Sequence, residues 1–554
     1  MLHCKLLPAG ALFVFLIPYT ALGQLLVVPE SAASSTGSPN STGGATPASW
    51  ATPTVTQATR LLDQTTFGVR AIDITNVQQI GLDAYITEQL NTPQTALGVL
   101  SDPLPKACMG DPGICFESEF WQTALTAPDQ LRQRVAFALS EMWVTSTQVI
   151  DGNAAPQYYN TLAKDAFTNW RTIMEDVTLS PAMGQYLSMV NSSKAPAGQI
   201  ANENYAREMM QLFSIGPVML NPDGTAQTDA SGDTIPAYTE AQVQAFARVY
   251  TGWTYATSTG VAPTSFPYYV PNYSMPMAAV DSSHDTTSKT LLNNVVLPAG
   301  QSTSQDLEAA LDNIFAHPNL PPFICKQLIQ HLVTSTPSSA YVERVSQVFI
   351  DNGSGVRGDM SAVITAILMD PEARAGDWDP NYDGGHLREP VLYLTNVMQA
   401  LKYMDINTGL EKQGAYVGLR NYTSPLGEIP LRSSSVFNFF SPSYVVPGTT
   451  LNAPEFGLEN TAAVQQRLTL ADQLSENQIA GFNGNLTVTS AMGQLAGNPS
   501  ALVDKLGVMF LHGRMPPAMR EMIVNEISSL TDIGQRVRVA VYLVISSSEY
   551  KVMH

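Results

Sequence analysis

The segment NENYAREMMQLFSIG, residues 202–216, combines ionisable and amide side chains with an apolar remainder. On a helix, Glu203, Arg207 and Gln211 recur every four residues, with Asn204 and Glu208 beside them, whereas the apolar side chains lie opposite. Glu203 precedes Arg207 by four residues, which is the favourable order for an ion pair. This polar face is either a solvated surface or the lining of a site.

A site on this face would depend on its carboxylates. Glu203 or Glu208 could act as a general acid or base if burial in a closed pocket raised its pKa. Arg207, or Lys289 from a later loop, could stabilise an anion. The motif HDTTSK adds an imidazole and another carboxylate. The catalytic candidates are therefore Glu203, Arg207, Glu208, His284 and Asp285.

A metal centre is the alternative that the same residues leave open. His284 and Asp285, with Glu203 or Glu208, could provide nitrogen and oxygen ligands for Zn²⁺, Mn²⁺ or Ca²⁺. The sequence has neither an HExxH motif nor a CxxC pair. It also lacks the GxSxG motif of a serine hydrolase and a Walker loop. We therefore predict no cofactor, with a divalent metal as the alternative.

The elements that would position these residues are mostly helices. Helical periodicity extends from about residue 56 to the C-terminus, with Pro, Gly and Asn between segments. Thr239, three residues before Gln242, has the spacing of a capping box and marks a helix N-terminus. Residues 217–236 and 254–301 lack this periodicity, and KTLLNNVVLPAG in the second segment could form a hairpin. We expect a mainly α fold, a large single multi-helical unit with long irregular loops and a minor β-hairpin.

The N-terminal residues have the composition of an export signal followed by a tether. Residues 1–23 contain Lys5, an apolar stretch and a small-residue cleavage pattern, which is typical of a signal peptide. Pro8 and Pro18 interrupt the apolar stretch, which falls short of the roughly 20 residues of a membrane-spanning helix. Residues 24–55 are rich in Ser, Thr, Gly and Pro and predict a flexible linker before a helical domain over residues 56–554. We expect an extracytoplasmic protein, either periplasmic or secreted.

The overall charge excludes one class of partner. The chain has 47 acidic and 28 basic residues, a net charge of −19. A protein this acidic does not bind nucleic acid by neutralising phosphates. No later apolar run reaches membrane-spanning length, so we expect no transmembrane segment in the mature chain.

Three cysteines follow the predicted leader. Cys108 and Cys115 flank MGDPGI, a Gly/Pro turn that could bring them together, and export permits oxidation. We predict a disulfide between them and a buried free thiol at Cys325.

Several blocks of the sequence resemble a known family. They are NENYAREMMQLFSIG, YTEAQVQAFARVYTGW, HDTTSKTLL, HPNLPPFICKQLIQHLVTSTPS, REPVLYL, SSSVFNFFSPSY and SSSEY. In this order, from about Thr59 onward, they resemble the bacterial family known as domain of unknown function 1800. The resemblance implies a large, exported, mainly helical protein without an established activity, often encoded beside another exported protein. Many relatives carry Trp-His-Asn-His-Phe where this chain reads ALSEMWVTS, so Ser140 and Met142 occupy the histidine positions.

The blocks that carry the resemblance repeatedly contain polar residues, which allows two arrangements. One is a cleft where the 202–216 helix, the helix after Thr239 and the His284 loop converge; the other is a buried structural network of paired charges. Binding candidates for the cleft are Asn204, Arg248, Lys289 and Arg388. Both arrangements use these side chains, so the sequence leaves the choice open.

Two functional hypotheses follow. The first, which we favour because the sequence offers no evident nucleophile or ligand set, is an exported binding or assembly protein. Its partner would be another exported protein encoded nearby or an envelope glycan, for which the aromatic residues of FNFFSPSY could form a platform. The second is an extracytoplasmic hydrolase or lyase with a carboxylate-centred, metal-assisted site.

Overall fold

The computed structural model describes residues 52–98, 108, 110–379, 382, 384–406, 410–487 and 489–554, with the backbone alone for residues 410–413. The predicted signal peptide (1–23) and residues 24–51 of the predicted linker lie outside the described residues.

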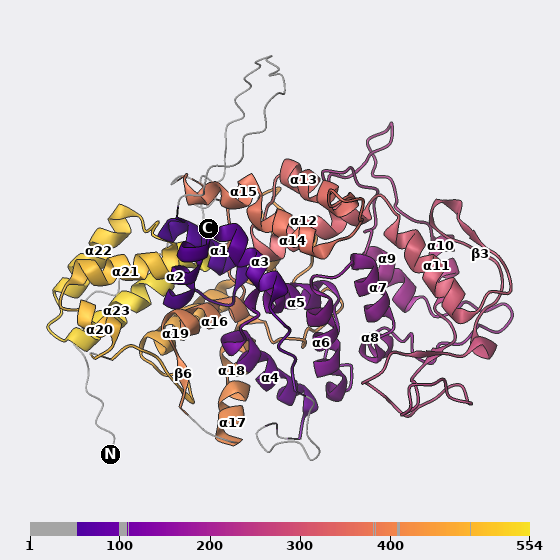
Figure 1. Cartoon of the computed structure of the whole chain (residues 1–554), viewed down its shortest axis with the longest axis horizontal. Helices are drawn as coiled ribbons and strands as arrows, with labels where there is room; N and C mark the ends of the chain where they lie inside the picture. The colour runs from indigo at the N-terminus through magenta and orange to yellow at the C-terminus, as the bar shows by residue number, and fades with distance from the viewer. Residues whose placement is uncertain are drawn as a thin grey trace.

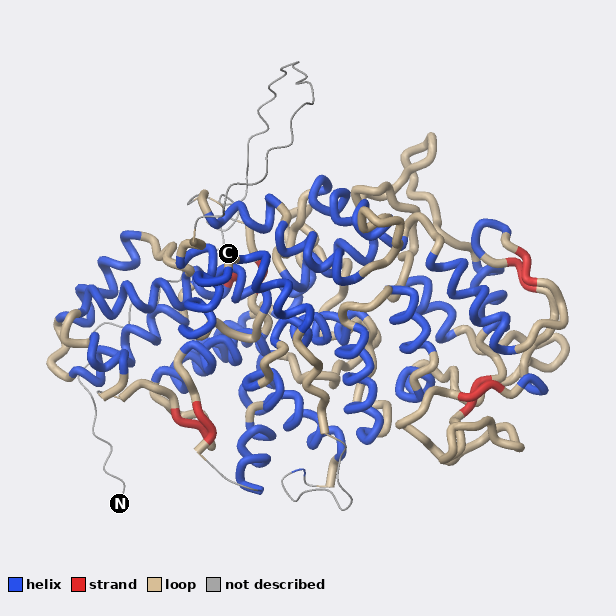
Figure 2. Tube along the Cα trace, viewed as in Figure 1, coloured by secondary structure: helices blue, strands red, loops and turns tan. Residues whose placement is uncertain are grey.

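Helices dominate the described chain, as Figure 2 shows in blue. In the first half they are α1 (Val55–Thr65), α2 (Ala71–Ile80), α3 (Leu82–Asn91), α4 (Pro112–Thr126), α5 (Gln130–Met142), α6 (Ala155–Asp165), α7 (Trp170–Thr178), α8 (Pro181–Tyr186), α9 (Asn204–Gln211), α10 (Glu240–Val249), α11 (Thr303–Phe315) and α12 (Leu320–Leu332). In the second half they are α13 (Ser339–Ile350), α14 (Met360–Met369), α15 (Pro371–Arg374), α16 (Pro390–Ala400), α17 (Leu410–Gly418), α18 (Arg420–Thr423), α19 (Thr461–Ser475), α20 (Ala491–Leu495), α21 (Pro499–Leu511), α22 (Pro517–Ser528), α23 (Ile533–Ile545) and α24 (Ser548–Lys551).

The strands are short and pair antiparallel in twos. They are β1 (Trp253–Thr254) with β2 (Ala278–Ala279), β3 (Lys289–Thr290) with β4 (Val296–Leu297), β5 (His386–Leu387) with β8 (Val552–Met553), and β6 (Met404–Asp405) with β7 (Phe482–Asn483). Short 3₁₀ turns are η2 (Gly152–Ala154), η3 (Asp281–Ser283), η4 (Leu292–Asn294), η5 (Ala375–Asp377), η6 (Ser424–Leu426) and η7 (Pro454–Leu458). The β3–β4 pair confirms the predicted hairpin, and the mainly α fold is confirmed.

The molecule is elongated (Figure 1). Helices α1 to α6 and α12 to α16 form its middle, α20 to α23 form one end, and α9 to α11 with β3 form the other. One continuous cluster of buried apolar side chains, from Ala58 to Tyr550, packs these parts into a single unit. Among the described residues, no helix is long and apolar enough to cross a membrane.

Capping side chains define where several helices begin. The Thr239 hydroxyl accepts a hydrogen bond from the Gln242 backbone, and the Gln242 side chain accepts one from the Thr239 backbone, which confirms the predicted capping box of α10. Thr54 and Gln57 form the same arrangement at α1. Helical structure therefore begins at Val55, the last residue of the segment predicted as a linker.

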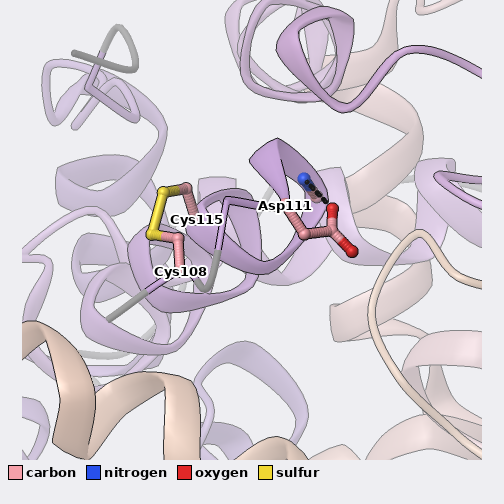
Figure 3. Close-up of a disulfide and its surroundings, with 4 residues drawn as sticks. Cys108, Asp111 and Cys115 are labelled. Atoms are coloured by element: carbon pink, nitrogen blue, oxygen red, sulfur yellow. Dashed lines mark hydrogen bonds between the residues drawn. A yellow bond between two sulfur atoms is a disulfide. The ribbon is translucent and has the colours of Figure 1, made fainter. Parts of the chain in front are cut away.

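The predicted disulfide is present. Cys108 and Cys115 are bonded at the N-terminus of α4, where Asp111 caps the helix by accepting a hydrogen bond from the Gly113 backbone at 2.8 Å (Figure 3). Cys325 is a buried free thiol in α12, as predicted, and burial raises its pKa.

Glu117, two residues after Cys115, is fully buried and makes stability depend on pH. Burial raises its pKa from 4.5 to about 7, although Arg420 lies 3.2 Å away. Between these values the folded chain keeps a proton that the unfolded chain releases, so the free energy of unfolding falls as pH rises from about 4.5 to 7.

We expect Glu117→Gln to remove up to roughly 3 kcal/mol of this pH dependence. Urea unfolding at pH 5 and pH 8 measures it. Exposed Glu88→Gln is the control, and an unchanged difference between the two pH values in Glu117→Gln would contradict the expectation.

Candidate functional site

The polar face of α9 is a surface ion-pair group. Arg207 Nη2 lies 2.8 Å from Glu203 Oε2 and 3.0 Å from Glu240 Oε1, with 38% of the Arg207 side chain exposed. Asn204 is exposed. Glu208 is half-buried, and burial raises its pKa. The favourable Glu203–Arg207 spacing thus forms the ion pair that it predicts, on the surface.

The His284 loop forms a separate buried network. His284 Nε2 lies 2.9 Å from Asp306 Oδ2, and its Nδ1 lies 2.8 Å from the Thr251 carbonyl oxygen. Lys289 Nζ donates to the same Asp306 oxygen at 2.6 Å. Both imidazole nitrogens therefore have protein partners, which favours the structural network over the metal alternative for His284. Asp306, the centre of this network, is a residue that the sequence analysis did not identify.

The remaining candidates are held by local or distant structural bonds. Asp285 accepts a hydrogen bond from the Thr287 backbone at 2.9 Å. Arg248 donates to the Thr287 hydroxyl at 2.6 Å on the exposed side of the same loop. Arg388 is buried elsewhere, where it donates two hydrogen bonds to Asp63. The structure brings Arg248, His284, Asp285 and Lys289 together, and places Arg388 apart from them.

A different group of buried ionisable residues lies in the middle of the molecule, where helices α5, α12 and α16 meet. Glu141 ends α5, His331 lies in the last turn of α12, and Glu389 immediately precedes α16. Each offers one ligand atom, and these atoms all lie within 4.8 Å of one another. His331 Nδ1 is 3.2 Å from Glu141 Oε2 and 3.9 Å from Glu389 Oε1. We call these three residues the His/Glu centre.

Neighbouring side chains extend the centre. His386 Nε2 lies 3.2 Å from Glu389 Oε1, and His386 Nδ1 lies 3.5 Å from Glu455 Oε1. Asn438 donates to Glu141 Oε1 at 3.2 Å. These contacts fix one oxygen each of Glu141 and Glu389. Among the described residues, Glu389 Oε2 has no hydrogen-bond partner, and Glu141 Oε2 has only its contact with His331.

The local backbone explains why Glu389 faces the centre. Glu389 is the N-cap residue of α16, and an N-cap residue commonly caps its helix with its side chain. Here Glu428 performs that role instead, because its Oε2 accepts the Val391 backbone N–H at 2.9 Å. The Glu389 carboxylate is therefore directed toward His331 and His386 rather than toward its own helix.

The electrostatics of the centre favour a cation. Burial, with the charge of Glu389, raises the pKa of Glu141 to about 7. Burial and the charges of Glu389 and Glu141 raise the pKa of Glu428 well above its ordinary value. Burial opposes a charged imidazole, yet hydrogen bonding to Glu141 and Glu389 raises the pKa of His331 to about 10. Burial is the largest cause for the two carboxylates, and the neighbouring carboxylates add a negative potential at all three groups. Burial also opposes the charged form of Glu389 itself, yet hydrogen bonds to His331 and His386 lower its pKa.

The helix ends add to this potential. Both α5 and α12 direct their C-termini at the centre, and a helix C-terminus carries a partial negative charge that attracts cations. Arg134 is the nearby permanent cation, and its Nη2 donates to the His331 carbonyl oxygen at 3.2 Å rather than to a carboxylate of the centre. The centre therefore has both the ligand types and the field of a divalent-cation site.

A polar cavity gives access to the centre. Its volume is about 20 Å³, which is room for about one water molecule, and its lining side chains include Glu141, His331, His386, Asn438 and Glu455. An adjoining groove of about 360 Å³ is lined mainly by apolar residues, and Gln327, Gln330 and Pro442 line both spaces. Of the predicted aromatic platform, Phe440 forms a wall of the cavity and Phe437 part of the groove.

The site residues predicted from the sequence do not include His331, His386, Glu428 or Glu455. Glu389 is one of the polar residues of the resembling block REPVLYL, for which the sequence leaves a cleft and a structural network open. Around Glu141, the prediction concerns only the histidine positions that Ser140 and Met142 occupy. The sequence offers two weak indications of a site, the His386-x-x-Glu389 spacing and His331 in a mostly apolar helical turn. No motif joins these residues to Glu141, Glu428 and Glu455, which lie in distant parts of the sequence.

The model of one protein family matches residues 60–552, and its description is "Protein of unknown function (DUF1800)". Comparison with curated proteins and with solved structures gave no match. Since the match covers nearly the whole chain, the protein belongs to the DUF1800 family.

Proposed function

We propose that the protein is an exported, metal-assisted hydrolase in which Glu141, His331 and Glu389 bind a divalent cation. The observation that carries this proposal is the convergence of two buried carboxylates and a partly exposed imidazole, with ligand atoms within 4.8 Å of one another, beside a polar cavity. Two carboxylates and an imidazole suit Zn²⁺, Mn²⁺ or Fe²⁺. A cation there would supply a Lewis acid, which lowers the pKa of a water molecule or polarises a carbonyl group.

His386 is the residue we assign to proton transfer. It lines the cavity, and its Nδ1 has no hydrogen bond among the described residues. Glu389 and Glu455 lie on its two sides and orient the ring. In hydrolysis, the water oxygen bonds to the acyl carbon while His386 accepts one water proton. The bond to the leaving group then breaks, and the leaving group receives a proton from His386.

Export is the second part of the proposal. It rests on the signal-like residues 1–23, and a disulfide such as Cys108–Cys115 persists in oxidising compartments outside the cytoplasm. The protein would act in the periplasm or after secretion.

The decisive experiment is elemental analysis of the mature protein purified without chelators or a histidine tag. We expect about one equivalent of a divalent metal in the wild-type protein and in Glu203→Gln, whose change lies on the α9 surface. Glu141→Gln is expected to lose it. Hydrolysis of p-nitrophenyl esters should stop with a chelator and return when metal is added. Absence of metal after incubation with Zn²⁺, Mn²⁺ and Fe²⁺ would refute the proposal.

A non-catalytic binding or assembly protein is the second candidate, and the apolar groove supports it. The partner would be another exported protein or an envelope glycan. This candidate predicts partner binding that is unchanged in Glu141→Gln and no metal-dependent hydrolysis. The experiment above therefore separates the two functions.

A further inference from the structure

The apolar groove is lined by the end of α9, the loop that follows it (residues 212–224), α12 and part of the segment 437–452. Its walls include Leu212, Val218, Leu220, Phe323 and Phe437. The groove volume of about 360 Å³ is near the lower end of the range for small-molecule sites, which are mostly apolar with few polar groups. The groove therefore has the size and lining of a site for an apolar ligand.

The backbone is shaped to keep this groove open beside Phe323. Gly216, directly after the helical turn that follows α9, has a φ of +72°, which glycine adopts without strain. A Cβ atom at this position would lie 2.8 Å from the Phe323 ring. Only a residue without a side chain allows this turn and this close approach together.

Lys326 is the charged residue in the groove lining. It is partly buried, and desolvation lowers its pKa. Its stem lies against the turn at Gly224, because a Cβ on that glycine would be 3.9 Å from Lys326 Cδ. Within the described part of the chain, its ammonium group has neither an ion-pair nor a hydrogen-bond partner. A partly desolvated cation without a partner creates a position where an anion is favoured.

The groove leads toward the His/Glu centre along α12. Phe323 and Lys326 line the groove, Gln327 and Gln330 line both spaces, and His331 lines the cavity. Five residues of α-helix separate Lys326 from His331, which corresponds to about 7.5 Å along the helix axis. A small molecule held at Lys326 would therefore extend to the edge of the catalytic cavity.

We infer that the groove binds the acyl chain of an anionic amphiphile, with the carboxylate of the ligand paired to Lys326. The apolar walls exclude a sugar or a free phosphate as the main body of the ligand, and the single cation selects a single negative charge. The inference rests on the proposed function only for the conversion of this ligand. Binding itself depends on the groove and not on the metal.

The test measures binding of palmitate and of hexadecanol, its uncharged analogue, by calorimetry in the presence of EDTA. We expect the wild-type protein to bind palmitate about tenfold more tightly, the effect of one charged hydrogen bond. Lys326→Gln should abolish this preference, whereas Lys505→Gln on α21 should retain it. Leu220→Trp, which fills the groove, should weaken both ligands.

Equal affinity of the wild-type protein for both ligands, or unchanged preference in Lys326→Gln, would overturn the inference. Tighter binding of an apolar peptide ending in a free carboxylate would also overturn the assignment of an acyl chain. Palmitate binding is measured in EDTA, so it does not depend on the metal. If palmitate binds but the protein purified without chelators never contains metal, the proposed hydrolase is refuted and this inference stands. If the protein contains the metal but does not bind palmitate, this inference is refuted and the proposed hydrolase stands.

Discussion

Replacing His331 by alanine is expected to lower metal affinity by at least about 100-fold, because the change removes the only nitrogen ligand of the three-residue centre. It also leaves the buried Glu141 and Glu389 carboxylates without the imidazole between them. The variant should therefore contain no metal after purification, and its chelator-sensitive esterase activity should be lost.

Metal content and activity must be compared with the folded state of the variant. Far-ultraviolet circular dichroism shows whether the helices persist. His284→Ala is the matched control, because its imidazole is also buried beside a carboxylate but belongs to the Asp306 network. We expect this control to lose stability and keep its metal. If His284→Ala lost the metal while His331→Ala retained it, the assignment of the centre would be wrong.

Replacing Asp63 by alanine is expected to reduce the free energy of unfolding by about 3–5 kcal/mol, because it leaves a buried guanidinium without its counter-ion. Arg388 donates to both carboxylate oxygens of Asp63, at 2.7 Å from Nη1 and 2.5 Å from Nη2. His512 Nε2 also lies 2.8 Å from Asp63 Oδ2. This group connects α1 to the start of α16 and the end of α21.

Urea unfolding at pH 7 measures this effect, with Asp73→Ala as the control. Asp73 pairs with Arg70 on the partly exposed α2, so its loss should cost less than about 1 kcal/mol. Burial would raise the pKa of Asp63, but Arg388 and His512 hold it well below the ordinary value of 3.8. The contribution of ionised Asp63 to the free energy of unfolding is therefore present above about pH 4 and is lost as the pH falls below that value. Similar losses in the two variants would contradict this account.

The features predicted correctly from the sequence depend on short separations along the chain. The Thr239–Gln242 capping box, the β3–β4 hairpin and the Cys108–Cys115 disulfide each join residues that are close in sequence. The Glu203–Arg207 ion pair also follows from helix periodicity alone. Local geometry is sufficient in these cases, because the partners meet once the helix or turn forms.

The sequence could not show which polar residues are buried. The patterns around Glu203 and Glu141 both place a carboxylate on a helix with apolar neighbours, yet Glu203 stays partly exposed in a surface ion pair and Glu141 is buried beside the cavity. The difference depends on which other helices pack on each face. His284 and His331 illustrate the same limit, because only their distant partners distinguish a structural imidazole from a candidate ligand.

The sequence by itself determined the fold class, the family, the local disulfide and the expectation of export, since composition, periodicity and short-range spacing carry that information. Only the tertiary structure decided where the candidate site lies. The His/Glu centre requires the C-termini of α5 and α12 to meet the N-terminus of α16, three elements far apart along the chain. Helix packing brings their carboxylates and imidazole together with little access to water, and this burial strengthens the interaction of the two carboxylates with a cation, which makes the group a candidate for metal binding.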